Sequence, residues 1–600
     1  MATFFVPGPF NEKAWVSENI HYQIKSETLE RTRAQESRAA IERLYIVMRH
    51  LFNRGYYKPF GESGKAIIHA LLTLEPEIYG SFADEEKVEL EGLVYVIDRL
   101  PKGIEACRLI TLSSDEGLRN TDFEVITPSK RRRNCYRIDE EQMFIEVTRG
   151  RSEIYDILAH LTFLFVEARK IARRAIDSNG NKTREWLKIE EIVQSSSLRE
   201  KEKALTYMGT ILGRTYGEVA HTYERFQENA GGNSGLFDVI YWLGTLAIEE
   251  LNGKERKITF SPSLRERIGH HIYGERWADQ IKQKLQELGL MDRPLHIISA
   301  NLHSVMNSLY AKAALGKKTT ADLSLEETAM LLSKKGNGHY MDKVADYARK
   351  NGMVTLHDNN GTNISVQLFD TEKINMNLLP GELQVDKKTA AANKPVILVM
   401  DYAFGEQAYE TMDELLKPFK RGGQVSYMNV HSISVMGKAG ILGGNKGDIM
   451  IPTAHVFEGT SDNYPFANAS AKDEFSGNGL NVYEGAMLTV LGTSLQNKDV
   501  LRYFKNSSWS AVGLEMEGAH YQKAIQAAAK IRRVISENVV LRYAYYASDN
   551  PLMTGHTLAS GSLGLIGVRP TYMITTSFLN QIFRQNRIDE KNTKAENELI

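Results

Sequence analysis

The sequence predicts an α/β fold in its second half and a large, mainly α-helical first half. Apolar residues recur at helical spacing through much of residues 33–289, and strand-like segments alternate with helices after Leu290. The composition, 42% hydrophobic and 25% charged residues, is that of an ordinary globular protein. A chain of 600 residues is too long for one hydrophobic core, since cores rarely grow past about 250–300 residues. We therefore expect a helical domain over 1–290 and an α/β domain over 291–588.

Helical stripes account for most of the first half. In residues 33–53, Ile41, Leu44 and Met48 fall on one face of a helix. The same spacing predicts helices in four further stretches: 152–174, 198–228, 236–252 and 263–289. A short β-like patch at 105–147 interrupts them. No residue of this half carries chemistry that the sequence alone identifies.

Strands alternate with helices in the second half, which is typical of a mainly parallel sheet covered by helices on both faces. Strands are expected near 295–299, 395–400, 430–436 and 448–451, and a last strand is expected to end at Tyr546. Residues 353–369 are expected to form a hairpin that turns at 359–361. Helices are expected near 406–418 and after Glu517. A polar tail, 589–600, follows the domain.

Charge and cysteine content narrow the classes of partner and compartment. The 74 Lys and Arg against 75 Asp and Glu give no reason to expect nucleic acid or a membrane as partner. Two cysteines cannot build a disulfide framework or a four-cysteine zinc site. No apolar run approaches the roughly 18–20 residues that span a bilayer, and the N-terminus does not resemble a signal peptide. We expect a cytoplasmic protein with no metal site and no cofactor.

Three segments of the second half carry residues suited to chemistry. In the first, a strand is expected to end at a turn of small residues, Gly437-Lys438-Ala439-Gly440, where backbone can approach a ligand closely. In an open α/β sheet, ligands bind at such strand ends. The second, Gly513-Leu-Glu-Met-Glu-Gly, precedes a helix. The third is a strand that delivers Ser548 and Asp549 to its carboxyl end.

Together these segments resemble the nucleoside phosphorylase/nucleosidase superfamily. Its members carry a Gly-x-Ala/Cys-Gly turn followed by Gly-Asp-Ile/Val, a Met-Glu pair that opens a helix, and Ser-Asp at the end of a late strand. The resemblance covers about residues 293–585 and is strongest to AMP nucleosidases. Ser548-Asp-Asn-Pro-Leu resembles their Ser-Asp-Lys-Pro-Leu, and Ala300-Asn301 resembles their Thr-Asn. It implies a nucleoside phosphorylase-like mixed sheet flanked by helices, a purine substrate and a homo-oligomer.

The resemblance also assigns roles. Cleavage of a purine N-glycosidic bond develops positive charge on the ribosyl ring and negative charge on the base. Asp549 matches the position that protonates the base, and Glu517 matches the carboxylate that grips the ribose hydroxyls, with Met516 packed under the ribose. An unperturbed Asp has a pKa near 3.9 and is almost fully ionised at pH 7. We therefore expect Asp549 to be buried.

The attacking group is less well defined by the sequence. Val435-Met436 stands where hexameric phosphorylases have an arginine, and Lys438 stands where they have a serine. Lys438 is a candidate to hold a phosphate group. Methylthioadenosine nucleosidases activate water with a glutamate soon after the first strand, but no carboxylate occurs here. His303 is the nearest base, and Glu406 is another candidate.

Each candidate also has a structural interpretation. Asp549 suits a cap on the turn before Pro551, Glu515 is as eligible as Glu517 to stabilise a helix N-terminus, and Lys438 suits a solvated surface position. We interpret the basic run Lys130–Arg133 as a solvated loop, with a phosphate-bearing ligand as the alternative. His303 suits a hydrogen-bonded structural role.

The resemblance to AMP nucleosidases favours hydrolysis of the N-glycosidic bond of a purine nucleotide or nucleoside. A purine nucleoside phosphorylase with an altered phosphate site and a non-catalytic nucleotide-sensing or scaffolding protein remain the alternatives.

Overall fold

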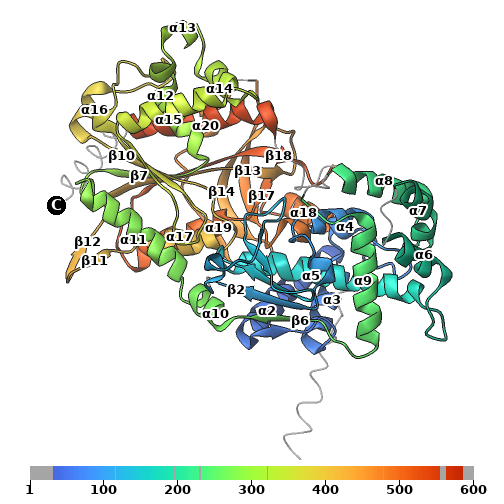
Figure 1. The fold of residues 1–600 in the computed structure, drawn as a ribbon. Coiled ribbons are helices and arrows are strands. Elements are labelled where there is room, and N and C mark those ends of the chain that lie inside the picture. Colours follow the sequence, from blue (N-terminus) through green and yellow to red (C-terminus); the bar gives the residue numbers. More distant parts are fainter. Residues whose placement is uncertain are drawn as a thin grey trace, which may run out of the picture.

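A computed structural model describes residues 32–114, 116–193, 198–228, 232–320, 322–477, 479–553 and 563–584. The polar tail predicted at 589–600 lies outside these residues. The described chain is a mixed α/β protein with a six-stranded sheet in its first half and a ten-stranded mixed sheet in its second half. Figure 1 shows the two halves packed side by side, with the second half in green to red.

The first half is largely helical. Its helices are α2 (Arg33–Arg54), α3 (Glu62–Leu74), α4 (Leu90–Ile97), α5 (Gly150–Ala175), α6 (Arg184–Val193), α7 (Leu198–Leu212), α8 (Tyr216–Glu228), α9 (Leu236–Leu251), α10 (Pro262–Gly269) and α11 (Ile272–Glu287). The expected stretch 198–228 is divided at Gly213. There φ is +64°, and a Cβ would lie 2.0 Å from the carbonyl oxygen of Glu86. The expected stretch 263–289 is also divided, at His270 and His271, into α10 and α11. The other helical predictions of the first half are confirmed.

The β-like patch of the first half is part of a larger sheet. Its strands are β1 (Tyr56–Tyr57), β2 (Leu109–Ser113), β3 (Val125–Ile126), β4 (Cys135–Arg137), β5 (Gln142–Glu146) and β6 (Lys257–Phe260), in the spatial order β1-β6-β2-β5-β4-β3. The strands β1 and β6 lie outside the expected patch, because short strands paired across two hundred residues leave little periodicity in the sequence.

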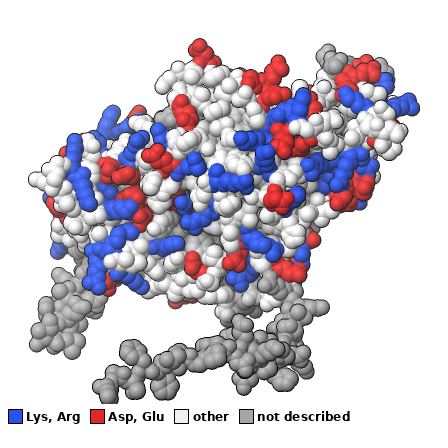
Figure 2. Space-filling model, turned by 90° about the horizontal axis from the view of Figure 1, so that it is seen from below, with Lys and Arg blue, Asp and Glu red and all other residues white. Residues whose placement is uncertain are grey.

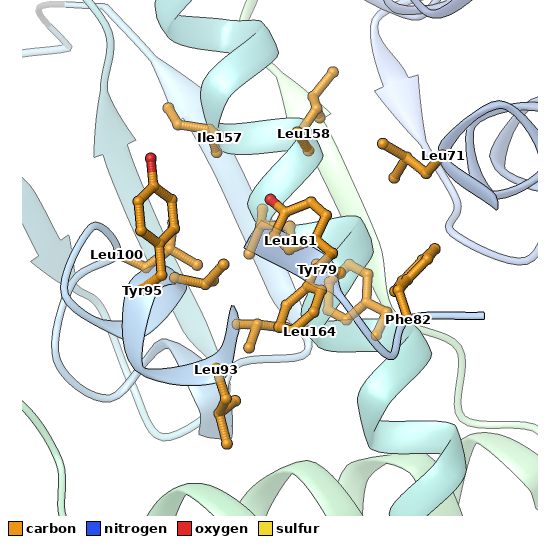
Figure 3. Close-up of a cluster of buried hydrophobic side chains, with 14 of the residues drawn as sticks. Leu71, Tyr79, Phe82, Leu93, Tyr95, Leu100, Ile157, Leu158, Leu161 and Leu164 are labelled. Carbon is orange, nitrogen blue, oxygen red and sulfur yellow. The ribbon is translucent and has the colours of Figure 1, made fainter. Parts of the chain in front are cut away.

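Helix α5 is the centre of the first core. Most of its residues are buried, and Ile157, Leu158, Leu161 and Leu164 point into a cluster with aromatic side chains of the preceding segments (Figure 3). Tyr79 stacks on Phe163 with ring centroids 4.5 Å apart. The same continuous core includes apolar residues of the second half, such as Leu514 and Met516, so the two halves share buried surface.

The second half supplies the large sheet and its covering helices. Its strands are β7 (Leu295–Ser299), β8 (Met353–Leu356), β9 (Val366–Asp370), β10 (Val396–Met400), β11 (Phe419–Arg421), β12 (Gln424–Ser426), β13 (Val430–Ile441), β14 (Ile449–Phe457), β15 (Asn463–Pro465), β16 (Val482–Thr489), β17 (Gly513–Glu515) and β18 (Val540–Asp549). Its helices are α12 (Leu302–Leu315), α13 (Lys317–Thr320), α14 (Leu325–Ser333), α15 (Gly338–Lys350), α16 (Lys387–Asn393), α17 (Gln407–Leu416), α18 (Lys498–Asn506), α19 (Gly518–Gln526) and α20 (Val568–Arg584).

Alternating side chains of the central strands divide between two helical layers. Ile297 and Leu398 pack in a cluster with α11, α17 and α19, whereas the neighbouring Ile298 and Val399 pack with α12, α15 and α20. This period of two is the pattern of a strand buried on both faces. Figure 1 shows the two groups of helices on opposite sides of β7 and β10. The expected coverage of both faces is confirmed.

The sheet is mixed, and five of its strands close on themselves. β7, β10, β13 and β18 run parallel, while β17 runs antiparallel to β13. β18 pairs with both β13 and β14, which completes a ring through β16 and β17. The hairpin expected at 353–369 is the antiparallel pair β8–β9.

The strand expected at 430–436 does not end there. β13 continues through the small residues to Ile441, so Gly437–Gly440 lies inside a strand and the turn prediction is wrong. The physical reason is a change of partner: β13 pairs with β7 through Val435 and with β17 from Gly440, while β18 stays paired with it through Gly440, with a register shift after Ala439. Similarly, β18 continues past Tyr546 to Asp549.

The surface and the helices add two observations. Basic and acidic side chains are interspersed over the face drawn in Figure 2. Among the described residues, every helix is too short or too polar to cross a bilayer.

The predicted domain boundary near 290 falls between α11 and β7. Helix α11 itself packs on the second half, where Trp277 Nε1 donates to the Ile364 carbonyl at 2.8 Å.

Candidate functional site

Pairing of three strands brings the Glu517 and Asp549 segments together. Asp549 ends β18 opposite Gly440 of β13, and Gly440 lies opposite Leu514 of β17. Adjacent strands are about 4.8 Å apart, so two such steps separate the backbones at Asp549 and Leu514 by roughly 10 Å. β17 then leads through Met516 to Glu517, which immediately precedes α19. The two acidic segments flank Gly440 in one region of the sheet.

Asp549 is fully buried, with 0% of its surface exposed. The Ser548 hydroxyl lies 2.6 Å from Asp549 Oδ1 and 3.1 Å from the Ala439 carbonyl oxygen, which ties the end of β18 to β13. The expected burial is confirmed. The next residue, Asn550, serves the following turn, since its Oδ1 accepts from the Leu552 amide at 3.1 Å. The turn before Pro551 is thus stabilised by Asn550.

Glu515 and Glu517, equally eligible in the sequence, differ in the structure. Glu515 accepts the Thr489 hydroxyl at 2.6 Å and the backbone amides of Glu517 and Gly518, so it stabilises the N-terminus of α19. Glu517 instead accepts the Gly405 amide at 2.9 Å from the loop after β10. The Glu517 carboxylate also accepts the backbone amide of the preceding residue, Met516, at 3.3 Å. The helix-terminus role belongs to Glu515, and Glu517 faces a different segment.

Burial changes the acidity of both carboxyls. Burial raises the pKa of Glu515 to about 8, and the neighbouring negative charge of Glu517 contributes to the rise. Burial also raises the pKa of Glu517, but its two backbone hydrogen bonds and the positive charge of Arg149 oppose that rise. Glu517 is therefore the better suited of the two to remain ionised.

The small-residue segment of β13 forms a wall beside these carboxyls. A Cβ at Gly437 would lie 3.6 Å from the Tyr545 ring and 3.9 Å from the Tyr402 ring, which leaves no room for a large side chain. Ala439 and Gly440 are buried, whereas Lys438 is exposed. Both interpretations of Lys438, a solvated lysine and a phosphate contact, are compatible with this position.

The three remaining candidates lie at the carboxyl ends of β7 and β10. Asn301 is the N-cap of α12, where its side chain accepts the Ser304 amide at 2.8 Å, so it has a structural role. His303 is exposed in the first turn of that helix. Glu406 begins α17 and pairs with Arg151 of the first half at 3.0 Å. An ion-paired Glu406 is poorly suited to act as a base.

Residues of the first half also reach this region, which the sequence did not indicate. Arg132 lies 3.7 Å from the Asp401 carboxylate, and the Arg149 guanidinium lies 5.1 Å from the centre of the Phe404 ring. The Ser152 hydroxyl accepts the Glu406 amide at 2.8 Å. The only signals in the sequence were the basic run at 130–133 and the Arg-Gly-Arg-Ser that opens α5.

The interpretation of the basic run as a solvated loop is wrong for two of its arginines. Arg131 and Arg133 both bind the Asp156 carboxylate, with nitrogen–oxygen distances of 2.8 Å, and Arg133 also pairs with Glu153 at 3.3 Å. Arg132 points away from these partners, with 77% of its side chain exposed.

A cavity of about 420 Å³ lies between the two halves, next to this region. Its lining includes Tyr45, Arg49, Arg151, Glu406, His520 and Lys523. Neither Glu517 nor Asp549 lines it.

One group of described residues has metal-ligand chemistry. Ligand atoms of His271, Asp413 and Glu414 lie within 4.8 Å of one another. Lys417 pairs with both carboxylates, at 3.3 and 2.6 Å, and Arg532 pairs with Asp413 at 2.7 Å. A metal ion would have to displace these cations, so the group is better described as an ion-pair network.

Comparison with known proteins places the chain in a family. Residues 65–335 and 328–584 match a family of unknown function, DUF6909, and the chain belongs to that family. No curated protein matches the chain.

Solved structures of nucleosidases and phosphorylases resemble about half of the chain. The 5′-methylthioadenosine/S-adenosyl homocysteine nucleosidase of Campylobacter jejuni is 9% identical, covering 49% of this chain and 99% of that chain with a TM-score of 0.29. The AMP nucleosidase of Bacteroides thetaiotaomicron is 12% identical, covering 53% and 98% with a TM-score of 0.28. The Toxoplasma gondii purine nucleoside phosphorylase is 13% identical, covering 49% and 93% with a TM-score of 0.28. Similarity at this level does not extend to activity.

Proposed function

We propose that this protein hydrolyses the N-glycosidic bond of a purine nucleotide or nucleoside, as AMP nucleosidases do. The single observation that carries the proposal is the placement of the Glu517 and Asp549 segments on either side of Gly440. These are the two carboxyls that the resemblance assigns to the ribose and to the base.

Asp549 is proposed to protonate the leaving base. As the C1′–N9 bond breaks, its electron pair moves to the purine, and Asp549 supplies a proton to a ring nitrogen. Such general acid catalysis contributes about 10²–10⁴-fold. Asp549 is completely buried, and the adjacent Ser548 hydroxyl fixes the orientation of its carboxyl.

Glu517 is proposed to hold the ribose. An ionised carboxylate accepts hydrogen bonds from both ribose hydroxyls and stabilises the positive charge that develops on the ring. The Gly405 amide and the nearby Arg149 charge favour the ionised form. Water then adds its oxygen to C1′ and releases a proton, which restores Asp549 directly or through solvent.

Phosphorolysis is the second candidate reaction. The observation that favours it is the exposed Lys438, which offers a positive charge on the β13 segment beside Gly440. In that reaction inorganic phosphate would replace water as the group that attacks C1′.

The test is release of free adenine from AMP and from adenosine, with and without added phosphate. We expect release that does not require phosphate. Asp549→Asn should lower the rate at least about 100-fold while nucleotide binding and the melting temperature are retained. Asp473→Asn, at an exposed position, is the matched control.

Two outcomes would contradict the proposal. Adenine release that depends strictly on phosphate would establish phosphorolysis. No base release from any purine nucleoside or nucleotide, combined with intact nucleotide binding, would favour the non-catalytic sensor.

A further inference from the structure

The loop that binds Glu517 is also contacted by arginines of the first half. This loop, residues 401–406, follows β10 and precedes α17. Its Gly405 amide donates to Glu517, while Asp401 and Phe404 face Arg132 and Arg149. We call Arg132 and Arg149 the arginine pair. The loop therefore joins the ribose carboxylate to two positive charges from the other half of the chain.

Arg149 is a largely buried cation that lacks an ionic partner. It immediately precedes α5, its Nε has no hydrogen-bond partner, and its guanidinium makes no ion pair within the described parts of the chain. The carboxylates of Glu153 and Glu517 act on Arg149 from beyond ion-pair distance, so its guanidinium keeps a hydrogen-bond donor that a directly bound anion would satisfy. Its charge favours the ionised form of Glu517, which places it near the ribose carboxylate.

Arg132 differs from the arginines on either side of it. Arg131 and Arg133 both bind Asp156, whereas the one ion pair of Arg132 among the described residues is its 3.7 Å contact with Asp401. With 77% of its side chain exposed, it can turn toward a ligand without breaking a strong bond. The chain thus fixes two arginines of the run structurally and leaves the one between them available.

The first turn of α5 adds positive potential at the same place. This helix has 26 residues, and its N-terminus begins at Arg149-Gly150, beside the 401–406 loop. Gly150 lies close to α17, since a Cβ there would be 3.1 Å from Glu410 Oε1. The Glu153 carboxylate already accepts the Thr148 and Arg149 amides at 3.1 Å, so the helix dipole adds only a small preference for a further anion here. The dipole acts together with the arginine pair.

We propose that Arg132 and Arg149 form an anion subsite that holds the 5′-phosphate of a purine nucleotide beside Glu517. This inference rests on the proposed function, because Asp549 takes the base and Glu517 the ribose. Passing from Asp549 through Glu517 to the arginine pair follows the order base, ribose and phosphate. Arginine binds phosphate bidentately, and two such cations offset the carboxylates of Glu517 and Asp401 that would otherwise repel it.

The test compares AMP with adenosine in the full chain without added phosphate. We expect Arg149→Gln to lower the preference for AMP, as a ratio of kcat/KM values, by about 10- to 100-fold, the size of one or two charge-assisted hydrogen bonds. Arg132→Gln should lower it by about 10-fold or less, since Arg132 is exposed. Arg173→Gln is the matched control, because Arg173 is exposed at the far end of α5 and pairs with Glu85.

A binding measurement keeps the subsite testable apart from turnover. Ribose 5-phosphate should raise the melting temperature of the unaltered protein more than ribose does, and this difference should shrink in both variants. If no purine substrate is turned over but this difference is seen, the proposed function fails and the subsite stands. Because Arg132 is exposed, Arg132→Gln remains informative even if Arg149→Gln does not fold.

Two results would overturn the proposal. An equal loss of AMP and adenosine turnover in both variants, with unchanged binding of ribose 5-phosphate, would make the arginine pair purely structural. If inorganic phosphate is required for turnover of adenosine and that requirement is lost in the variants, the subsite holds free phosphate and the assignment to the 5′-phosphate is wrong.

Discussion

Buried charges are treated in opposite ways in two regions of the molecule, around Asp156 in the first half and around Glu517 in the second. In the first half, Asp156 forms ion pairs with Arg131 and Arg133, and Glu250 pairs with Arg256 at 2.8 Å. In the second half, Glu515 and Glu517 accept only backbone amides and a hydroxyl within the described residues. The first arrangement neutralises buried charge, whereas the second leaves carboxyls whose pKa is raised by burial.

The difference indicates where chemistry is expected. A buried ion pair fixes geometry and is costly to break, but it rarely takes part in proton transfer. Carboxyls held by neutral donors, with a pKa shifted toward neutrality, are characteristic of active sites. The arginine pair lies where these two regions meet.

The largest expected effect comes from replacing Glu515 and Glu517, one at a time, by glutamine. Glu517→Gln should lower kcat by about 10²–10³-fold, because it removes electrostatic stabilisation of the cationic sugar. Glu515→Gln should act mainly on the melting temperature, since Glu515 binds the start of α19. Steady-state base release and thermal unfolding of both variants decide the point. A larger loss of kcat in Glu515→Gln would reverse the two roles.

Breaking an ion pair of the first half should act on stability instead. Asp156→Asn leaves the buried Arg131 without its counter-charge and Arg133 with Glu153 alone, and should reduce the free energy of unfolding by about 3–5 kcal/mol. Urea denaturation measures this change. Asp346→Asn, which removes an exposed pair with Arg349 on α15, is the control and should cost at most about 0.5 kcal/mol. Equal losses in the two variants would refute the distinction drawn here.

The pH dependence of stability tests the raised pKa of Glu515. Its pKa is about 8 in the folded protein and near 4.3 in an unfolded chain, so the folded state binds this proton more tightly. Its contribution to stability is complete below the unfolded pKa and is lost as the pH rises through 8. Between these values, the wild type should lose stability relative to Glu515→Gln by on the order of 1 kcal/mol per pH unit. The free energy of unfolding of both proteins is measured by denaturation at pH 5, 6.5 and 8. A difference between wild type and Glu515→Gln that stays the same at all three pH values would contradict this prediction.

The smallest expected effect concerns Asn301. Asn301→Ala should destabilise the protein by about 1 kcal/mol through loss of the cap on α12, and Asn301→Ser should restore the stability. If Asn301 also touches the substrate, Asn301→Ser would keep the melting temperature of the wild type but show a raised KM. A wild-type KM in Asn301→Ser would leave only the structural role.

Local patterns predicted much of this fold, and long-range contacts explain what they missed. Helix α5 was recognisable because its apolar stripe is continuous, and both faces of β7 and β10 are buried as their apolar runs indicated. The continuation of β13 was missed because glycines suggest a turn, whereas here they permit a change of partner strand.

The residues of the candidate site likewise divide into those that local motifs identified and those that only long-range contacts place. Glu517, Asp549 and Ser548 were identified through their motifs, but only their hydrogen bonds separate Glu517 from Glu515. The contact of Arg149 with Phe404 joins residues that are far apart in the chain and leaves no periodic signal. The structural role of Asn301 was likewise hidden, because a helix cap and a ligand contact use the same side-chain oxygen.

The closed ring of strands has a consequence for synthesis on the ribosome. β18 is the strand that completes the ring, and it carries Asp549 at its end. The six-stranded sheet of the first half ends with Phe260 and can form while later residues are still being translated, whereas the core that it shares with the second half is completed afterwards. The region around Gly440 cannot take its final shape until residue 549 has emerged, so a truncated nascent chain would carry Glu517 without the strand that brings Asp549 beside it.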